Sequence, residues 1–364
     1  MNRGRKKMVV VHPSDEMYGA DKVLLESLTE IPSNWDVEVW LPTDVDYPRK
    51  ELSTALASMG HTVRYLSLPV IRRSYLRPGA LPGLAIRFFR IAIELLRARP
   101  DTVYVSTSAL APMLPLARLV KASTVLHLHE YFDRRTALFV TPFLYFTQRI
   151  VCVSEAIREP LRAGLRRRTR VIYNGFDLPS PAPEPLPIGG PVVCLVASRW
   201  NAWKGHDILL DAWDAVRRTD LSLVVLGAPP ANGEAFDVAG RVRDLNNPGS
   251  VTIAGQTSDV RSYIDAAHLV LVPSVKPDPL PTIAIEAMAA GRAVMASDSG
   301  GLPEIVGNDG GYLVETGNVA AWVRALEGIS SEDVSARSDK ARARFEEKFA
   351  VRRYRNEIAE VLWR

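Results

Sequence analysis

Two acidic residues eight positions apart, Asp278 and Glu286, lie at a predicted junction between a strand and a helix. The apolar run 269–272 ends at Pro273, where the strand is expected to stop. A helix is expected to begin near Thr282, a residue type favoured at N-cap positions. Open α/β sheets bind ligands at the carboxyl ends of their strands, so both carboxylates are expected to approach one crevice. The structural alternative is a carboxylate that only stabilises the start of the helix.

Two cations, Arg199 and Lys204, occupy the corresponding position after the apolar run 192–198. The residues that follow, up to about 216, have the apolar spacing of a helix that packs one face on a core. Cationic side chains next to the free N–H groups of a helix start form a diphosphate site. Two solvated loop cations are the alternative.

Histidine and glycine supply the remaining candidates in the first half of the chain. His127 and His129 lie two positions apart at the end of a strand-like run, so they point to the same face, and His129 is nearer the carboxyl end. His129 could donate a hydrogen bond to a sugar hydroxyl or assist proton transfer. The alternative is a core histidine whose ring nitrogens are hydrogen-bonded within the protein. Gly19 lies in the first strand-to-helix loop, which lacks the G-x-G-x-x-G fingerprint of dinucleotide oxidoreductases. No cluster of metal-ligating residue types is evident, and we predict no bound metal.

Strand-like and helix-like runs alternate along the chain and position these residues. This alternation indicates α/β domains with parallel sheets. Six prolines and two glycines in 177–191 mark a boundary between two such halves. We predict an N-terminal Rossmann-like domain over 1–178, a Pro-rich linker over 179–191, a C-terminal Rossmann-like domain over 192–340, and a terminal helix over 341–364 that can cross back to the first domain. The predicted strands are 7–12, 36–42, 62–68, 102–107, 124–132, 149–155 and 170–177, then 192–198, 221–228, 250–256, 268–274, 292–298 and 311–317.

Composition limits the class of protein. The chain is 47% hydrophobic and 24% charged, as in ordinary globular proteins, and has no apolar run of the ~18 residues that span a bilayer. Cys152 and Cys194 lie in apolar strand-like runs, which favours reduced thiols and a cytoplasmic location. Residues 1–180 hold 26 Lys and Arg against 17 Asp and Glu, and the remainder holds 19 against 24. This asymmetry favours an anionic substrate or surface for the first half, and no nucleic-acid partner is expected.

Segment 71–100 mixes arginines with large apolar residues. Its helical part, from about Leu84, places Phe89, Ile93 and Leu96 on one side, a pattern typical of a helix at an anionic bilayer surface. The protein is therefore expected to attach peripherally to the inner face of a membrane. The alternative is that the apolar residues pack on the sheet while the arginines are solvated.

Taken together, these stretches resemble the retaining, sugar-nucleotide-dependent glycosyltransferases of family 4, which have the two-domain GT-B fold. The resemblance covers nearly the whole chain and is densest at 153–161, 198–213, 253–274 and 283–306. It implies a metal-independent transferase without a cofactor, whose donor is a nucleotide-diphosphate sugar and whose acceptor is a glycan or lipid-linked hydroxyl. Synthesis of bacterial-type cell-surface polysaccharide or glycolipid is the expected setting.

The resemblance also implies roles for the acidic pair. Glu286 would bind the donor ribose hydroxyls, since a carboxylate accepts two O–H bonds. Asp278 would touch the transferred sugar, but the family has Glu there, so this contact is expected to differ. The usual Phe-Gly is Leu-Pro at 280–281, and Pro281 has no N–H. Phosphate contacts from this loop would therefore come from Thr282 and Ile283.

The other candidates take their roles from the same resemblance. Arg199 and Lys204 match the family's diphosphate-binding pair, which stabilises the charge that develops on the leaving group. Gly19 matches the loop that approaches the donor phosphate, although the second glycine of that loop is Ala20 here. His129 matches the histidine near the transferred sugar, and Thr257 is a candidate backbone contact to the base. Two alternatives stay open: a sugar-nucleotide epimerase, and a non-catalytic sugar-nucleotide-binding protein.

Overall fold

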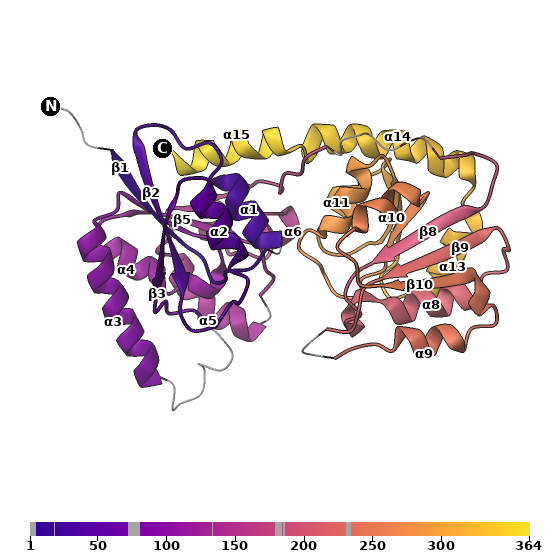
Figure 1. Ribbon diagram of the computed structural model, residues 1–364, viewed down its shortest axis with the longest axis horizontal. Coiled ribbons are helices and arrows are strands. Elements are labelled where there is room, and N and C mark those ends of the chain that lie inside the picture. The colour runs from indigo at the N-terminus through magenta and orange to yellow at the C-terminus, as the bar shows by residue number, and fades with distance from the viewer. Residues whose placement is uncertain are drawn as a thin grey trace. The chain divides into compact units, whose positions relative to one another are not determined.

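The computed structural model describes residues 5–17, 19–71, 81–132, 134–178, 184, 186–230 and 234–364. It divides the chain into two compact units: residues 1–175 with 351–364, and residues 176–350 (Figure 1). Residues 179–183 and 185 of the predicted linker lie outside the described residues. Within the described part of the chain, every helix is too short or too polar to cross a bilayer.

The first unit is a seven-stranded parallel sheet with the strand order β3-β2-β1-β4-β5-β6-β7. Its central strands are apolar and buried because helices cover both faces, as the uninterrupted run at Met8–Val11 predicts. The strands are β1 (Lys6–Val11), β2 (Trp35–Pro42), β3 (Thr62–Leu66), β4 (Thr102–Val105), β5 (Ser123–Leu128), β6 (Arg149–Cys152) and β7 (Thr169–Val171). The helices are α1 (Gly19–Ser27), α2 (Glu51–Ser58), α3 (Leu81–Ala98), α4 (Met113–Leu119), α5 (Arg134–Leu144), α6 (Glu155–Arg158), α7 (Ala163–Arg166) and α15 (Val351–Leu362).

The second unit repeats this architecture with six parallel strands in the order β10-β9-β8-β11-β12-β13. The order reverses between β8 and β11, the topological switch point where such sheets bind ligands. The strands are β8 (Val192–Ala197), β9 (Leu221–Leu226), β10 (Val251–Gly255), β11 (Leu269–Val272), β12 (Ala293–Ser297) and β13 (Gly311–Val314). The helices are α8 (His206–Ala215), α9 (Val238–Arg243), α10 (Val260–Ala266), α11 (Thr282–Ala289), α12 (Leu302–Val306), α13 (Val319–Gly328) and α14 (Ser331–Lys348).

All thirteen predicted strands are present, and the predicted fold class is confirmed. The terminal helix expected over 341–364 is instead two helices, α14 and α15, which belong to different units. The large apolar residues of this segment divide accordingly: Phe345 is buried in the second unit, whereas Tyr354 and Ile358 enter the core of the first. The Tyr354 hydroxyl lies 2.6 Å from Ser27 Oγ, which fixes α15 to α1.

Candidate functional site

The loop after β8 carries the two predicted cations and packs closely on the loop after β11. Gly205 has φ 75°, and a Cβ there would lie 1.9 Å from the carbonyl oxygen of Pro273, so only glycine fits. Val275 N donates to the carbonyl of Trp203 at 3.0 Å, which fixes the two loops together. The polar residues of both loops therefore lie at the carboxyl ends of β8 and β11, beside the switch point of the sheet.

Lys204 and Asp278 form an ion pair across these loops. Lys204 Nζ lies 2.6 Å from Asp278 Oδ2, and their side chains are only 17% and 12% exposed. The ammonium also lies 4.2 Å from the centroid of the Trp203 ring, a cation–π distance. Arg199, in contrast, is exposed, and its guanidinium has no partner among the residues that the structure describes. The loop thus holds one cation fixed by a carboxylate and one available to a ligand.

Two glycines after β12 hold Asp278 in place. Gly301 N donates to the carbonyl of Asp278 at 2.8 Å, and Gly300 has φ 63°. A Cβ at Gly300 would lie 2.4 Å from the same carbonyl oxygen, so the two segments are in direct backbone contact. Neither glycine is among the predicted site residues. A Gly-Gly pair just after the predicted strand 292–298 is the signal that could have identified them.

Helix α11 begins at Thr282, but the predicted capping role of Thr282 is wrong. Pro281 occupies the N-cap position, no side chain caps the helix, and Thr282 is the first helical residue. The first N–H groups of a helix have no intrahelical acceptor. The N–H groups of Thr282 and Ile283 are the first two of the helix, and an anion at this end of it can accept from them.

Glu286 lies one turn further along α11, in surroundings different from those of Asp278. It is half-buried and lines a hollow of about 230 Å³ together with Asp177, Arg261 and three apolar residues. Asp278 does not line this hollow and contacts Lys204 instead. The two carboxylates therefore have different immediate neighbours, although both were expected to approach one crevice. Thr257 is half-buried after β10, and its Oγ1 accepts from Asp259 N at 3.0 Å.

The histidine candidates lie at the carboxyl ends of strands in the first unit. The His127 and His129 rings are 4.1 Å apart, which confirms that they share one face. His127 is a buried core histidine whose Nδ1 bonds the Tyr104 hydroxyl at 2.8 Å. Burial and the nearby His12 lower the pKa of His129 to about 3. His129 is therefore neutral at physiological pH and can exchange hydrogen bonds with a hydroxyl without carrying charge.

Three further polar residues at this edge of the sheet, His12, Ser106 and Glu130, are not among the predicted site residues. His12 follows β1; its Nε2 lies 2.8 Å from Asp21 Oδ1, and its Nδ1 lies 2.6 Å from Ser106 Oγ. These two contacts of His12 connect the first turn of α1, which begins at Gly19, to the ends of β1 and β4. Glu130 follows His129 and accepts from the hydroxyls of Thr107 and Ser108. A polar residue at the carboxyl end of a predicted parallel strand is the signal that could have identified His12, Ser106 and Glu130.

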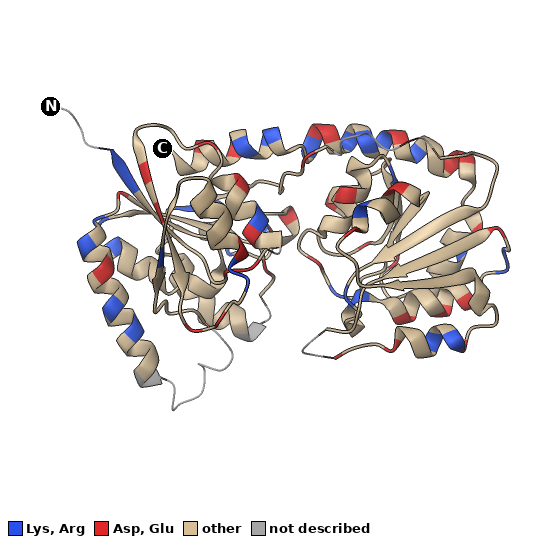
Figure 2. Cartoon of the chain, viewed as in Figure 1, with Lys and Arg blue, Asp and Glu red and all other residues tan. Residues whose placement is uncertain are grey.

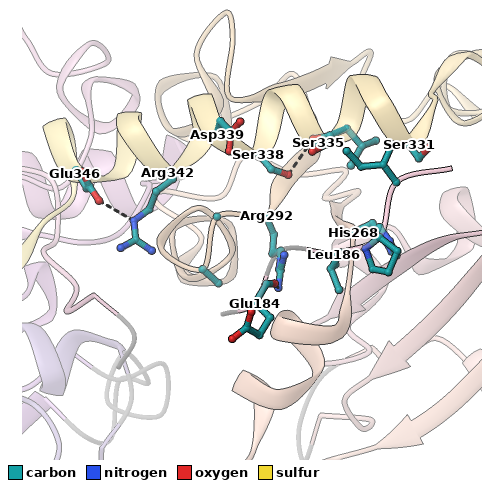
Figure 3. A pocket seen from close by; sticks show the side chains of 15 residues that line it. Glu184, Leu186, His268, Arg292, Ser331, Ser335, Ser338, Asp339, Arg342 and Glu346 are labelled. Carbon is teal, nitrogen blue, oxygen red and sulfur yellow. Dashed lines mark hydrogen bonds and ion pairs between the residues drawn. The ribbon is translucent and has the colours of Figure 1, made fainter. Parts of the chain in front are cut away.

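A cavity at the amino ends of β11 and β12 is separate from these residues (Figure 3). It measures about 410 Å³, and His268 and Arg292, which precede the two strands, line it. The buried Arg292 guanidinium donates to the carbonyls of Glu184 and Asp265. These bonds have a structural role, because they connect Glu184 to Asp265 in α10. In the described ranges, no three His, Cys, Asp or Glu side chains converge as metal ligands, and metal independence stays a prediction.

Sequence comparison identifies the family to which this arrangement belongs. Residues 190–332 match the family described as "Glycosyl transferases group 1", and residues 49–179 match "Glycosyltransferase Family 4". The chain belongs to the family-4 glycosyltransferases with the GT-B fold, as the sequence resemblance implies.

Curated relatives match parts of the chain. The lipopolysaccharide 1,2-N-acetylglucosaminetransferase of Salmonella typhimurium is 37% identical over 133 residues, 34% of this chain and 35% of that protein. The phosphatidyl-myo-inositol mannosyltransferase of Mycobacterium leprae is 29% identical over 192 residues, half of each chain. An uncharacterized glycosyltransferase of Methanocaldococcus jannaschii is 29% identical over 209 residues, 56% of each. The matches thus span between about a third and just over half of the length of these relatives.

Solved structures resemble the whole chain. HepE of Anabaena in complex with UDP has a TM-score of 0.78 at 22% identity and covers 98% of this chain and 99% of its own. The lipopolysaccharide outer core galactosyltransferase WaaB has a TM-score of 0.75 at 16% identity, with 98% and 99% covered. At these identities the likeness establishes the fold, which is GT-B.

Proposed function

We propose that the protein is a retaining glycosyltransferase that transfers a sugar from a nucleotide-diphosphate sugar to a hydroxyl of a glycan or lipid-linked acceptor. The observation that carries the proposal is the arrangement at the switch point of the second unit. There Arg199, the Lys204–Asp278 pair and the start of α11 lie at the ends of β8 and β11. Family membership and the partial matches to glycosyltransferases of lipopolysaccharide and inositol lipids support it.

The proposed reaction breaks the bond between the anomeric carbon and the donor phosphate and forms a bond from that carbon to the acceptor oxygen. The acceptor hydroxyl loses its proton to an oxygen of the departing diphosphate. Arg199, Lys204 and the N–H groups at Thr282 and Ile283 would stabilise the negative charge that develops on that diphosphate. Glu286 would accept hydrogen bonds from the ribose hydroxyls.

Asp278 has a second role in this proposal. Its carboxylate holds Lys204 at 2.6 Å, so it positions the cation that would meet the diphosphate, in addition to any contact with the sugar. Neutral His129 in the first unit would exchange hydrogen bonds with the transferred sugar. We propose that the reaction requires neither a metal nor a cofactor and that it contributes to cell-surface polysaccharide or glycolipid synthesis in the cytoplasm.

A peripheral membrane location is also proposed, and the surface of α3 supports it. Of the predicted row, Phe89 and Leu96 are 70% and 61% exposed, and Ile93 is half-buried. Ile86, about one turn before Phe89, is 54% exposed, whereas Ile91 and Leu95 of the same helix are buried in the core. The alternative in which all apolar residues of this helix pack on the sheet does not account for that exposed row. Basic residues lie along the same helix (Figure 2), as attachment to an anionic bilayer requires. Residues 72–80 of the predicted segment lie outside the described residues.

The test is turnover of UDP-, GDP- and ADP-sugars by the purified protein in EDTA, measured as nucleotide release with and without a lipid extract as acceptor. A transferase releases nucleotide faster when the acceptor is present. An epimerase converts the sugar nucleotide without releasing nucleotide, and a non-catalytic binder does neither. Release that requires an added metal would contradict the metal-independent reaction.

A further inference from the structure

A groove of about 670 Å³ crosses the surface of the first unit between the loop after β5, helix α5 and the α6–α7 segment. Ile157, Leu161 and Leu165 are buried and form part of its apolar lining. Leu138 and Tyr145 also line it, yet they are 79% and 43% exposed. The groove therefore presents apolar side chains to solvent, where burial by a ligand would be favourable.

One polar residue of the groove connects it to the candidate site of this unit. Glu130 lines the groove and directly follows His129 at the carboxyl end of β5. The hydroxyls of Thr107 and Ser108 donate to its two carboxylate oxygens, and the backbone N of His129 lies 3.3 Å from Oε2. The carboxylate is thus held by the turn after β4 and by the backbone that follows β5. Glu130 brings the lining of the groove to the residue next to His129.

One basic side chain, Arg162, lines the groove, and Glu130 is its one acidic lining residue in the described part of the chain. Arg162 is exposed and has no side-chain partner among the described residues. Arg166 and Arg167, at the end of α7, are exposed as well. A ligand that complements this surface has a hydrocarbon part for the lining and an anionic group for the guanidinium, which binds phosphate well.

We propose that the groove binds the hydrocarbon chain of a lipid-phosphate acceptor, with the phosphate at Arg162 and the hydroxyl-bearing end toward Glu130 and His129. This inference rests on the proposed function, since it names the class of its acceptor. The volume lies within the range of small-molecule sites, which favours a single chain over a segment of a partner protein.

The experiment measures binding of butyl, hexyl and octyl phosphate, each below its micelle concentration, to the full-length protein by calorimetry. Affinity should rise about fourfold for each methylene that enters the groove, because burial of one methylene is worth about 0.8 kcal/mol. Leu138→Asp should flatten this dependence. Leu119→Asp is the matched control, since Leu119 is equally exposed (77%) on α4 and does not line the groove. Arg162→Gln should weaken all three probes by the same factor without changing the slope.

An affinity that is independent of chain length, or equal flattening by Leu138→Asp and Leu119→Asp, would overturn the proposal. So would binding to phospholipid vesicles without binding of the monomeric probes, which would assign the groove to a bilayer surface. A dimer that Leu138→Asp dissociates, in the absence of probe binding, would assign it to a second copy of the chain.

Nucleotide-sugar turnover of the same preparations separates this inference from the proposed function. Turnover without chain-length-dependent binding overturns the groove assignment alone. Chain-length-dependent binding in a protein that turns over no nucleotide sugar overturns the proposed function and leaves the groove as a lipid-phosphate site.

Discussion

The Lys204–Asp278 ion pair should show strong energetic coupling. Two unit charges 2.6 Å apart attract by about 6 kcal/mol at an effective dielectric constant of about 20. Desolvation of two side chains that are only 17% and 12% exposed offsets more than half of this attraction. We therefore expect a coupling energy of about 2–3 kcal/mol between Lys204→Met and Asp278→Asn.

A double-mutant cycle measures this coupling as the difference between the double variant and the sum of the single variants. Because the chain contains two units, hydrogen exchange at the amides of β8 and β11 during urea titration is more informative than one global transition. The Arg261–Asp265 pair is the matched control: it has the same 2.6 Å separation, but its side chains are 39% and 31% exposed. That pair should couple by only about 0.3–0.5 kcal/mol.

A coupling energy below about 0.5 kcal/mol for Lys204 and Asp278 would refute this reasoning. Asp278 would then not be what holds the cation, and its role would reduce to the sugar contact that the family resemblance implies. Equal coupling in both pairs would show that burial does not distinguish them.

Three further predictions concern other parts of the molecule. Glu286→Gln should weaken binding of the free nucleoside diphosphate by roughly 1–3 kcal/mol in calorimetry, and unchanged nucleotide affinity would contradict the ribose contact. Asp278→Ala should instead mainly reduce turnover. The folded pKa of His129, about 3, lies below the usual value of 6.5, so the unfolded chain binds an extra proton between these values and stability should fall as pH decreases from 6.5 toward 3. His129→Asn should reduce that slope in urea titrations at pH 4–7, and an unchanged slope would argue against the lowered pKa of His129. Phe89→Glu should abolish salt-sensitive co-sedimentation with anionic vesicles, while Ile188→Glu, a comparably exposed apolar position (58%) in the second unit, should preserve it; equal binding of both variants would exclude α3 as the contact.

The fold was predictable because local patterns determine it. Uninterrupted apolar runs such as Met8–Val11 fit strands covered on both faces, and all thirteen predicted strands form. Helix ends were less predictable, because a helix can begin without a side-chain cap, as α11 does after Pro281. The division of the terminal segment into α14 and α15 depends on which core each helix enters, and the spacing of apolar residues along the segment does not encode that.

The site was predictable as a set of residues but not as a set of partners. Strand ends located Arg199, Lys204 and Asp278, yet the ion pair between the last two depends on the approach of two loops that are 74 residues apart. That approach requires Gly205 against Pro273 and Gly300 against Asp278. A single sequence shows the glycines without showing what they contact.

Binding of a nucleoside diphosphate to the second unit is the central claim, and calorimetric titration of UDP, GDP and ADP in EDTA tests it most directly. At least one of the three should bind the wild-type protein, and Arg199→Ala and Lys204→Met should each weaken that binding by about 10- to 100-fold, since each removes a charged hydrogen bond. Absence of binding for all three nucleotides, or unchanged affinity when both cations are replaced, would contradict the account.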